Sequence, residues 1–394
     1  MSQLRILVVA TKSPWPPVDG GRLVLLKTIE ALAARGNRVD LAAPCTESIA
    51  ETTDALSEIC TPHLVQARPH SSPASAVLSL KNSTPITVAR HTLTGVRRKV
   101  LDLLDAGTID VIHAEQLHSL PQTSPAARSG IPVVHRAHNV ESILWAYSAG
   151  YRGPATRPLL ALEARRMSTY EIQALRSTAC TVVLTEVDRR ALSDLVPGAA
   201  IHTIRAPFDA ELPPGDTPLE GNPAVVTLVS ATWAPSLDAV THLASEIWPT
   251  VRRRLPGAIL HVFGGDRHLE AHEGVVGHRS PEESRTAFPE GAIGIIPERH
   301  PTGVPMKALE SWARGLPLLV DGPTAEVLEA EDGEELVVAR DAEGYADALS
   351  RLVEEKGLRE RVIVGGRRAL VEKHDPAGIA EHLERVYRWA IEKA

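Results

Sequence analysis

Short apolar runs alternate with amphipathic helical stretches along this chain of 394 residues. In the first half, stretches with helical spacing separate the runs RILVVA, VDLAAP, IDVIHAE and IPVVHRAH. The alternation starts again after residue 223 with the runs AVVTLVSA, AILHVFGG, AIGIIP, LPLLV and EELVVARD. Short apolar strands that alternate with helices are typical of a parallel sheet covered by helices on both faces. The sequence therefore predicts two doubly wound α/β domains.

The boundary between the two domains is predicted from composition. Residues 209–223 contain four prolines and two glycines with little apolar content, which is typical of a linker. We therefore expect a first domain over residues 1–208 and a second domain over residues 224–376. A last amphipathic helix is expected over residues 377–394.

Composition and charge exclude several classes of protein. Apolar residues make up 43% of the chain and charged residues 23%, as in a soluble globular protein. The net charge of −7 and the lack of a dense Lys/Arg run argue against a nucleic-acid partner. The three cysteines are too far apart for a disulfide framework. With no signal peptide or membrane span at the start of the sequence, we expect a cytoplasmic protein without stable membrane insertion.

Two loops of the first domain are candidate binding sites, because ligands of doubly wound sheets bind at the carboxyl ends of the strands. Gly20 and Gly21 stand at a predicted helix start and let the backbone approach an anion, although a plain tight turn fits equally. His138 follows a buried strand, where it could donate to a phosphate or sugar oxygen or move a proton. A histidine satisfied by backbone is the alternative, and we favour it for His135.

A third candidate loop, RHPTG, precedes a helix that we expect to begin near Pro305 and to end at Gly315. Arg299 and Lys307 would add positive charge to the free N–H groups of the helix start and so form an anion site. Glu310 could accept hydrogen bonds from ribose hydroxyls. A nucleoside diphosphate fits both features. A solvated ion pair between Lys307 and Glu310 is the alternative.

A metal site is not expected. The spacings of His113, His118, His135 and His138 match no compact zinc motif, and no cysteine accompanies them. The chain has no Asp-x-Asp pair that would hold a divalent ion against a diphosphate.

These loops, in this order, resemble the retaining GT-B glycosyltransferases of glycosyltransferase family 4, and the resemblance runs over essentially the whole chain. Its most specific segment is GVPMKALESWARGLPLLV. The family usually shows a glutamate, seven residues and a second glutamate. The second position is Glu310, which the resemblance implies binds the nucleotide ribose, whereas Thr302 stands at the first position. Lys307 matches a side branch of the family that carries lysine at this position.

The resemblance implies a GT-B fold: two Rossmann-like domains that face each other across a cleft, with the last helix crossing back onto the first domain. His138 matches the histidine that contacts the transferred sugar, and we expect His138 and Lys307 to be the catalytic residues. The remaining donor-binding candidates are Gly20, Gly21, Ser230, Thr232, Gly277, His278, Arg299, Thr302, Gly303, Val304 and Glu310. The acceptor-side candidates are Asp19, Glu115 and Asn139.

The expected function is a metal-independent, retaining transfer of a sugar from a GDP- or UDP-linked nucleotide sugar to a small soluble acceptor, without a further cofactor. The expected pathway is bacterial secondary metabolism, and a homodimer is among the expected states. A GT-B sugar-nucleotide epimerase, a polysaccharide or cell-envelope glycosyltransferase and a non-catalytic nucleotide-sugar binder are the alternatives.

Overall fold

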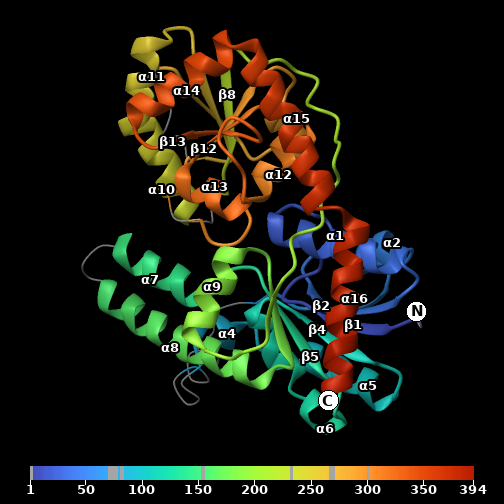
Figure 1. Cartoon of the computed structure of the whole chain (residues 1–394). Helices are drawn as coiled ribbons and strands as arrows, with labels where there is room; N and C mark the ends of the chain where they lie inside the picture. The colour runs from blue at the N-terminus through green and yellow to red at the C-terminus, as the bar shows by residue number, and fades with distance from the viewer. Residues whose placement is uncertain are drawn as a thin grey trace. The chain divides into compact units, whose positions relative to one another are not determined.

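The chain divides into two compact units in the computed structural model, which describes residues 3–69, 79, 84–151, 156–230, 234–265, 271–299 and 301–394 (Figure 1). Unit 1 consists of Met1–Pro207 together with Pro376–Ala394, and unit 2 of Phe208–Asp375. Each unit contains one parallel sheet with helices around it. The prediction of two doubly wound α/β domains is therefore confirmed.

The sheet of unit 1 has seven parallel strands in the order β3-β2-β1-β4-β5-β6-β7. Its strands are β1 (Arg5–Val9), β2 (Arg38–Cys45), β3 (Thr61–Gln66), β4 (Val111–Glu115), β5 (Val133–Ala137), β6 (Cys180–Val183) and β7 (Ile201–Thr203). Its helices are α1 (Gly20–Ala34), α2 (Ile49–Leu56), α4 (Ile86–Arg90), α5 (Thr94–Asp105), η1 (Leu117–Thr123), α6 (Ala126–Ser129), α7 (Glu141–Tyr151), α8 (Arg157–Ser177), α9 (Glu186–Leu195) and α16 (Pro376–Lys393).

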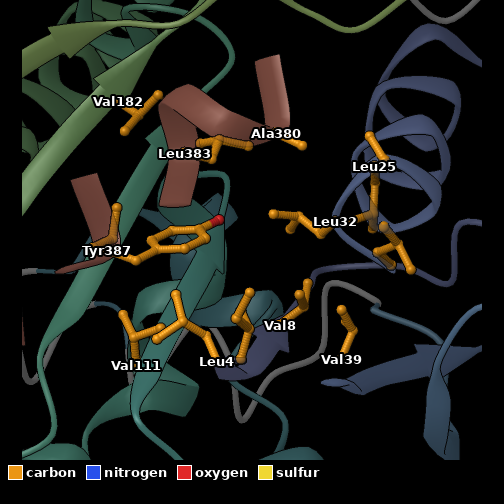
Figure 2. Close-up of a cluster of buried hydrophobic side chains, with 14 of the residues drawn as sticks. Leu4, Val8, Leu25, Leu32, Val39, Val111, Val182, Ala380, Leu383 and Tyr387 are labelled. Atoms are coloured by element: carbon orange, nitrogen blue, oxygen red, sulfur yellow. The ribbon is translucent and has the colours of Figure 1, made fainter. Parts of the chain in front are cut away.

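Alternate residues of β1 show why this sheet is covered on both faces. Ile6 and Val8 belong to one buried cluster, and Leu7 and Val9 belong to another. Successive strand residues point to opposite faces, so a strand that is apolar throughout needs a layer on each side. Figure 2 shows the first cluster, in which Ala380, Leu383 and Tyr387 of α16 meet Leu25 and Leu32 of α1. The opposite face packs against residues of α5, namely Val96, Val100 and Leu104.

The sheet of unit 2 has six parallel strands in the order β10-β9-β8-β11-β12-β13. Its strands are β8 (Ala224–Leu228), β9 (Ile259–Phe263), β10 (Val275–His278), β11 (Ile293–Ile296), β12 (Leu318–Asp321) and β13 (Val337–Ala339). Its helical elements are α10 (Ala234–His242), η2 (Leu243–Ile247), α11 (Trp248–Arg254), η4 (Ser284–Ala287), α12 (Met306–Ala313), α13 (Gly322–Leu328), α14 (Ala342–Glu354) and α15 (Lys356–Lys373).

A proline and a glycine in unit 2 mark the start and the end of a helix, as the sequence predicts. Helix α12 begins immediately after Pro305, and Gly315, with φ +72°, follows its end.

Pro249 does not end its helix. A π-turn, η2, precedes it and α11 continues beyond it. Proline lacks the N–H that an α-helical bond needs at this point, and a π-turn is one way to accommodate that loss.

The stretch 209–223, predicted as a linker, packs on unit 2. The backbone N–H of Leu212 donates to the Ala313 carbonyl at 2.9 Å, and that of Gly215 donates to the Phe288 carbonyl at 2.9 Å. Prolines and glycines therefore mark an ordered surface segment here rather than a free tether. None of the helices in the described part of the chain has both the length and the apolar character needed to cross a membrane.

Candidate functional site

Each sheet has one point where the strand order reverses, and the candidate residues collect there. In unit 1 the reversal lies between β1 and β4, and in unit 2 between β8 and β11. Loops that leave the carboxyl ends of two such strands diverge, which leaves room for a ligand between them. The loops in question are those after β1 and β4 in unit 1, and those after β8 and β11 in unit 2.

The start of α1 carries one charged pair of the unit 1 site. Asp19 caps the helix by accepting from the Arg22 N–H at 2.9 Å, and its two carboxylate oxygens lie 2.7 and 2.8 Å from Lys12 Nζ. Burial opposes ionisation of Asp19, but Lys12 and the capped N–H outweigh it and lower its pKa. Lys12, which the sequence reading missed, thus places a cation at this helix start.

Gly21 lies against the loop that follows β4. A Cβ atom at Gly21 would lie 3.2 Å from Gln116 Nε2 and 3.5 Å from Lys12 Nζ, so only glycine fits without displacing a neighbour. Gln116 itself has φ +66°, a conformation that costs a non-glycine residue about 1–3 kcal/mol and is found preferentially at functional sites. Gly21 therefore lies close to another loop of the same unit, and the predicted approach of an anion to the glycine pair stays a prediction.

His138 lies at the centre of a hydrogen-bonded cluster. It follows the carboxyl end of β5, its Nε2 bonds to Glu115 Oε1, and its Nδ1 lies 3.3 Å from Gln116 Nε2. The other oxygen of Glu115, Oε2, lies 2.5 Å from His113 Nε2. The structure thus brings together His138, Glu115 and the Gly21 loop, all from the sequence-predicted set.

Glu115 does not face solvent. It is 2% exposed and histidines occupy both of its oxygens. Burial alone would raise its pKa, but the two imidazoles hold the pKa well below its usual range, so the carboxylate is ionised. The structure therefore does not present Glu115 to an acceptor, contrary to the predicted role, and instead makes it the partner of His138.

Asn139 and the start of α7 form a second carboxyl cluster beside His138. Glu171 of α8 accepts from the Glu141 N–H at 2.9 Å and from the Ser142 hydroxyl at 2.5 Å, and so caps α7. Burial first, and then the neighbouring Glu171, raise the pKa of Glu141 to about 8, although a hydrogen bond with Asn139 opposes the shift. Glu141 is therefore protonated at neutral pH.

Lys307 in unit 2 pairs with a residue that the sequence reading missed. Its Nζ lies 2.6 Å from Glu298 Oε1 and 3.5 Å from Ser236 Oγ. Ser236 donates to the same carboxylate oxygen at 2.7 Å. Burial opposes ionisation of Glu298, but Lys307 and Ser236 outweigh it and lower the pKa. The side chain of Lys307 is 12% exposed, so the cation sits at the edge of the domain interior.

Glu310 pairs with Arg314 rather than with Lys307. Arg314 Nη2 and Nε lie 2.7 and 3.0 Å from Glu310 Oε1, and the Ser284 hydroxyl donates to that oxygen at 2.5 Å. The alternative prediction, a solvated ion pair between Lys307 and Glu310, is therefore wrong, because each of these two residues pairs with a different one. Arg314 stands four residues after Glu310 on the same helical face, which favours their contact. Among the residues that the structure describes, Glu310 Oε2 has no hydrogen-bond partner.

The other candidates of unit 2 follow the strand ends. Arg299 Nη2 lies 3.6 Å from Asp238 Oδ2, and Ser230 is exposed after β8. Gly303 is buried between the half-buried Thr302 and Val304 in the loop before α12. Thr232 lies outside the described residues.

Gly277 and His278 lie on β10, an edge strand, and not in a loop. The His278 ring stacks on Phe263 with centroids 4.2 Å apart, and its Nε2 lies 2.9 Å from His261 Nδ1. His278 is therefore part of an aromatic cluster at the end of β9 and β10. Its predicted place beside a nucleobase stays a prediction.

The histidines considered for a metal lie in different surroundings. His135 is buried within β5, and its Nδ1 lies 3.4 Å from the Thr181 hydroxyl, a side-chain partner rather than the predicted backbone one. In the described ranges, no three His, Cys, Asp or Glu side chains are grouped so that they could hold a metal ion.

Two protein-family models match the chain, one for each half. Residues 18–212 match the model of Glycosyltransferase Family 4, and residues 223–355 match the model of Glycosyl transferases group 1. No curated protein matches the sequence significantly.

Solved structures of glycosyltransferases share the fold over the whole length. Sucrose-phosphate synthase from Thermosynechococcus elongatus superposes with a TM-score of 0.74 at 14% identity, with 100% of both chains covered. HepE from Anabaena, in complex with UDP-glucose, superposes with a TM-score of 0.64 at 14% identity and coverage of 98% and 99%. WaaG, involved in lipopolysaccharide biosynthesis, gives 0.60 at 13% identity with the same coverage. The chain is therefore a glycosyltransferase with the GT-B fold, built from a Glycosyltransferase Family 4 domain and a Glycosyl transferases group 1 domain.

Proposed function

We propose that this glycosyltransferase moves a sugar from a GDP- or UDP-linked nucleotide sugar to a small soluble acceptor with retention of the anomeric configuration. The observation that carries the proposal is the half-buried Lys307 cation at the point of unit 2 where the strand order reverses. HepE binds UDP-glucose, which supports a nucleotide sugar as the donor. Retention is what the Family 4 resemblance implies.

Lys307 is proposed to bind the donor diphosphate. Its ammonium has three N–H donors, and Glu298 and Ser236 hold it from one side, so it can also bond a phosphate oxygen. Negative charge grows on the diphosphate as the sugar leaves. A fixed cation is therefore worth more in the transition state than in the ground state. Arg299, which is more exposed, would add a weaker contribution of the same sign.

Glu310 is proposed to bind the ribose. Arg314 and Ser284 hold its Oε1 and orient the carboxylate, so Oε2 is the oxygen proposed to accept the ribose hydroxyls. In unit 1, His138 is proposed to contact the transferred sugar, with Asp19 and Asn139 nearest to the acceptor. The reaction is proposed to be a front-face displacement without a protein nucleophile, so catalysis rests on positioning and on charge stabilisation.

The pathway belongs to the proposal as well. A bacterial secondary metabolite is proposed as the acceptor. A cell-envelope polysaccharide precursor is the alternative, and WaaG, involved in lipopolysaccharide biosynthesis, supports that alternative.

The test is a panel of GDP- and UDP-linked sugars with candidate acceptors, in the presence of excess chelator. Release of nucleoside diphosphate that depends on an acceptor, with NMR showing an unchanged anomeric configuration, is the expected result. Scrambling of the donor sugar without an acceptor would indicate an epimerase, and binding without turnover would indicate a non-catalytic binder. Activity that disappears with chelator and returns with Mg²⁺ or Mn²⁺ would contradict metal independence.

A further inference from the structure

A continuous chain of hydrogen bonds crosses unit 1 and passes through both ring nitrogens of His138. At its far end the Tyr387 hydroxyl of α16 lies 2.6 Å from His113 Nδ1. At its near end the Thr11 hydroxyl donates to Gln116 Oε1 at 2.7 Å. The complete chain runs through Tyr387, His113, Glu115, His138, Gln116 and Thr11.

The direction of each bond follows from its neighbours. Gln116 uses its oxygen for Thr11, so its amide nitrogen donates to His138 Nδ1. The imidazole then carries its proton on Nε2 and donates it to Glu115. On the other side, His113 Nε2 donates to Glu115, and its Nδ1 accepts from Tyr387. Every donor in the chain thus points toward the one carboxylate.

The surroundings keep this arrangement in place. Tyr387 is fully buried in the apolar cluster beneath α16, and His113 is fully buried on β4. Figure 2 shows the Tyr387 ring between Leu383 and Val111, with other apolar side chains of that cluster around it. Loss of the hydrogen-bond partner of its hydroxyl would destabilise the fold, because a buried polar group without a hydrogen bond costs free energy. The far end of the chain is therefore anchored in the core.

We infer that Glu115 and Gln116 are positioning residues that hold His138 in a single orientation as the Nε2–H tautomer, and that Tyr387 and His113 in turn orient Glu115. This inference rests on the proposed function insofar as His138 acts on the transferred sugar. It explains why a glutamate with no access to solvent lies beside the predicted catalytic histidine. It also explains why Gln116 keeps a positive φ, since that backbone places its amide between Thr11 and His138.

The first test measures the tautomer without substrate. In ¹⁵N-histidine NMR the parent enzyme should show His138 as a single Nε2–H tautomer. Glu115→Gln offers one carbonyl and one amide nitrogen to two imidazoles, so at least one histidine must change its tautomer. Mixed or reversed His138 signals are expected in Glu115→Gln. A matched control is Glu384→Gln, a buried glutamate of α16 that bonds Arg35 and Asn37, and it should leave the His138 signals unchanged.

The second test separates positioning from a merely structural role. Glu115→Gln should lower kcat by roughly 10- to 100-fold, as is typical when the residue that orients a reacting ligand is lost, with little change in KM for the donor. Tyr387→Phe should lower kcat less. Gln116→Leu, at the less buried end of the chain, repeats both measurements if Glu115→Gln does not fold.

The outcomes for the two proposals are distinguishable. A parent His138 on Nδ1, or unchanged tautomer and turnover in both Glu115→Gln and Gln116→Leu, would overturn the positioning inference. If the tautomer changes as expected but His138→Ala retains full turnover, the inference about Glu115 stands and the proposed role of His138 fails.

Discussion

The strand-order reversals of the two units hold their charged residues in different ways. In unit 1 the His138 hydrogen-bonded cluster is centred on one carboxylate, Glu115, and histidines bond to both of its oxygens and lower its pKa. In unit 2 the charges come as opposite pairs, Lys307 with Glu298 and Arg314 with Glu310. The first arrangement is a closed network of hydrogen bonds, whereas the second holds a cation that can share its donors with an anion.

This difference indicates that the two units contribute to catalysis in different ways. A buried network in which every group is satisfied fixes geometry, because any rotation leaves a polar group unpaired. A lysine at the edge of the interior keeps its charge and can bind phosphate without leaving its carboxylate. We therefore expect substitutions at unit 1 to affect turnover through orientation, and substitutions at unit 2 to affect it through charge.

Lys307→Met gives the largest expected effect. The change removes the charge and keeps most of the side-chain length, so turnover should fall by about 100- to 1,000-fold while donor affinity changes much less. Steady-state kinetics with the donor varied measures both. Arg299→Met, at a more exposed site, should act in the same direction but less.

The partner of Lys307 requires a control, because Lys307→Met leaves the Glu298 carboxylate without its cation. The double variant with Glu298→Gln removes both charges. If the cation itself acts on the diphosphate, the double variant stays as slow as Lys307→Met. Recovery to within about threefold of the parent, well under 1.4 kcal/mol in barrier height, would mean that the lysine serves only to neutralise Glu298.

His138→Ala should lower turnover by about 100-fold, the loss that misplacing a bound substrate by about 1 Å can cause, because the proposed contact positions the transferred sugar. Affinity for free nucleoside diphosphate, measured by calorimetric titration, should stay unchanged. His202→Ala, on β7 of the same unit, is the control and should leave turnover near that of the parent. An equal loss of affinity for the bare nucleotide would contradict the assignment and would make the two units alike in function.

Glu310→Ala should weaken binding of nucleoside diphosphate by about 1.5–3 kcal/mol, the range for hydrogen bonds to a charged group. This corresponds to roughly 10- to 150-fold in Kd. Because Arg314 loses its partner in this variant, Arg314→Met is the control. It breaks the same ion pair but leaves the carboxylate in place. If both variants lose the same affinity, the ion pair and not a ribose contact accounts for the loss.

Most strands of both sheets could be predicted from the sequence because their apolar runs are continuous and the breaks between them are marked. The edge strands β3, β7 and β10 could not, because they are mostly half-exposed and have no such run. The site was predictable only in part. His113 and Glu115 are two residues apart on β4, so they share one face, and β5 is the next strand. Their contact with His138 therefore had a signal in strand periodicity, which a motif-based reading does not use.

Other partners had no local signal. Tyr387 is 274 residues away from His113, and Glu298 is nine residues before Lys307, a spacing outside any helical or strand rule. Glu310 had two cations within helical reach, Lys307 at three residues and Arg314 at four, and spacing alone does not choose between them. In the fold, Glu298 bonds Lys307, and Arg314 bonds Glu310.

The last expected effect concerns stability. It sharpens the comparison within unit 1, where Glu141 and Glu115 have pKa values shifted in opposite directions. Burial and then Glu171 raise the pKa of Glu141 to about 8, so the folded protein binds a proton that the unfolded chain, with an ordinary carboxyl pKa, releases above about pH 4.5. Since the folded state binds more protons between these values, stability is fully present below pH 4.5 and decreases as the pH rises toward 8. Glu141→Gln mimics the protonated side chain and should remove this decrease, a gain of about 3–4 kcal/mol at pH 8 and of about 1 kcal/mol or less near pH 5. Urea denaturation midpoints at both pH values measure this gain in stability.

Glu384→Gln is the control, because a carboxylate whose pKa is lowered stabilises equally at pH 5 and pH 8. Parallel curves for the parent and Glu141→Gln between these pH values would mean that Glu141 is ionised in the fold, and that both glutamates beside His138 carry charge.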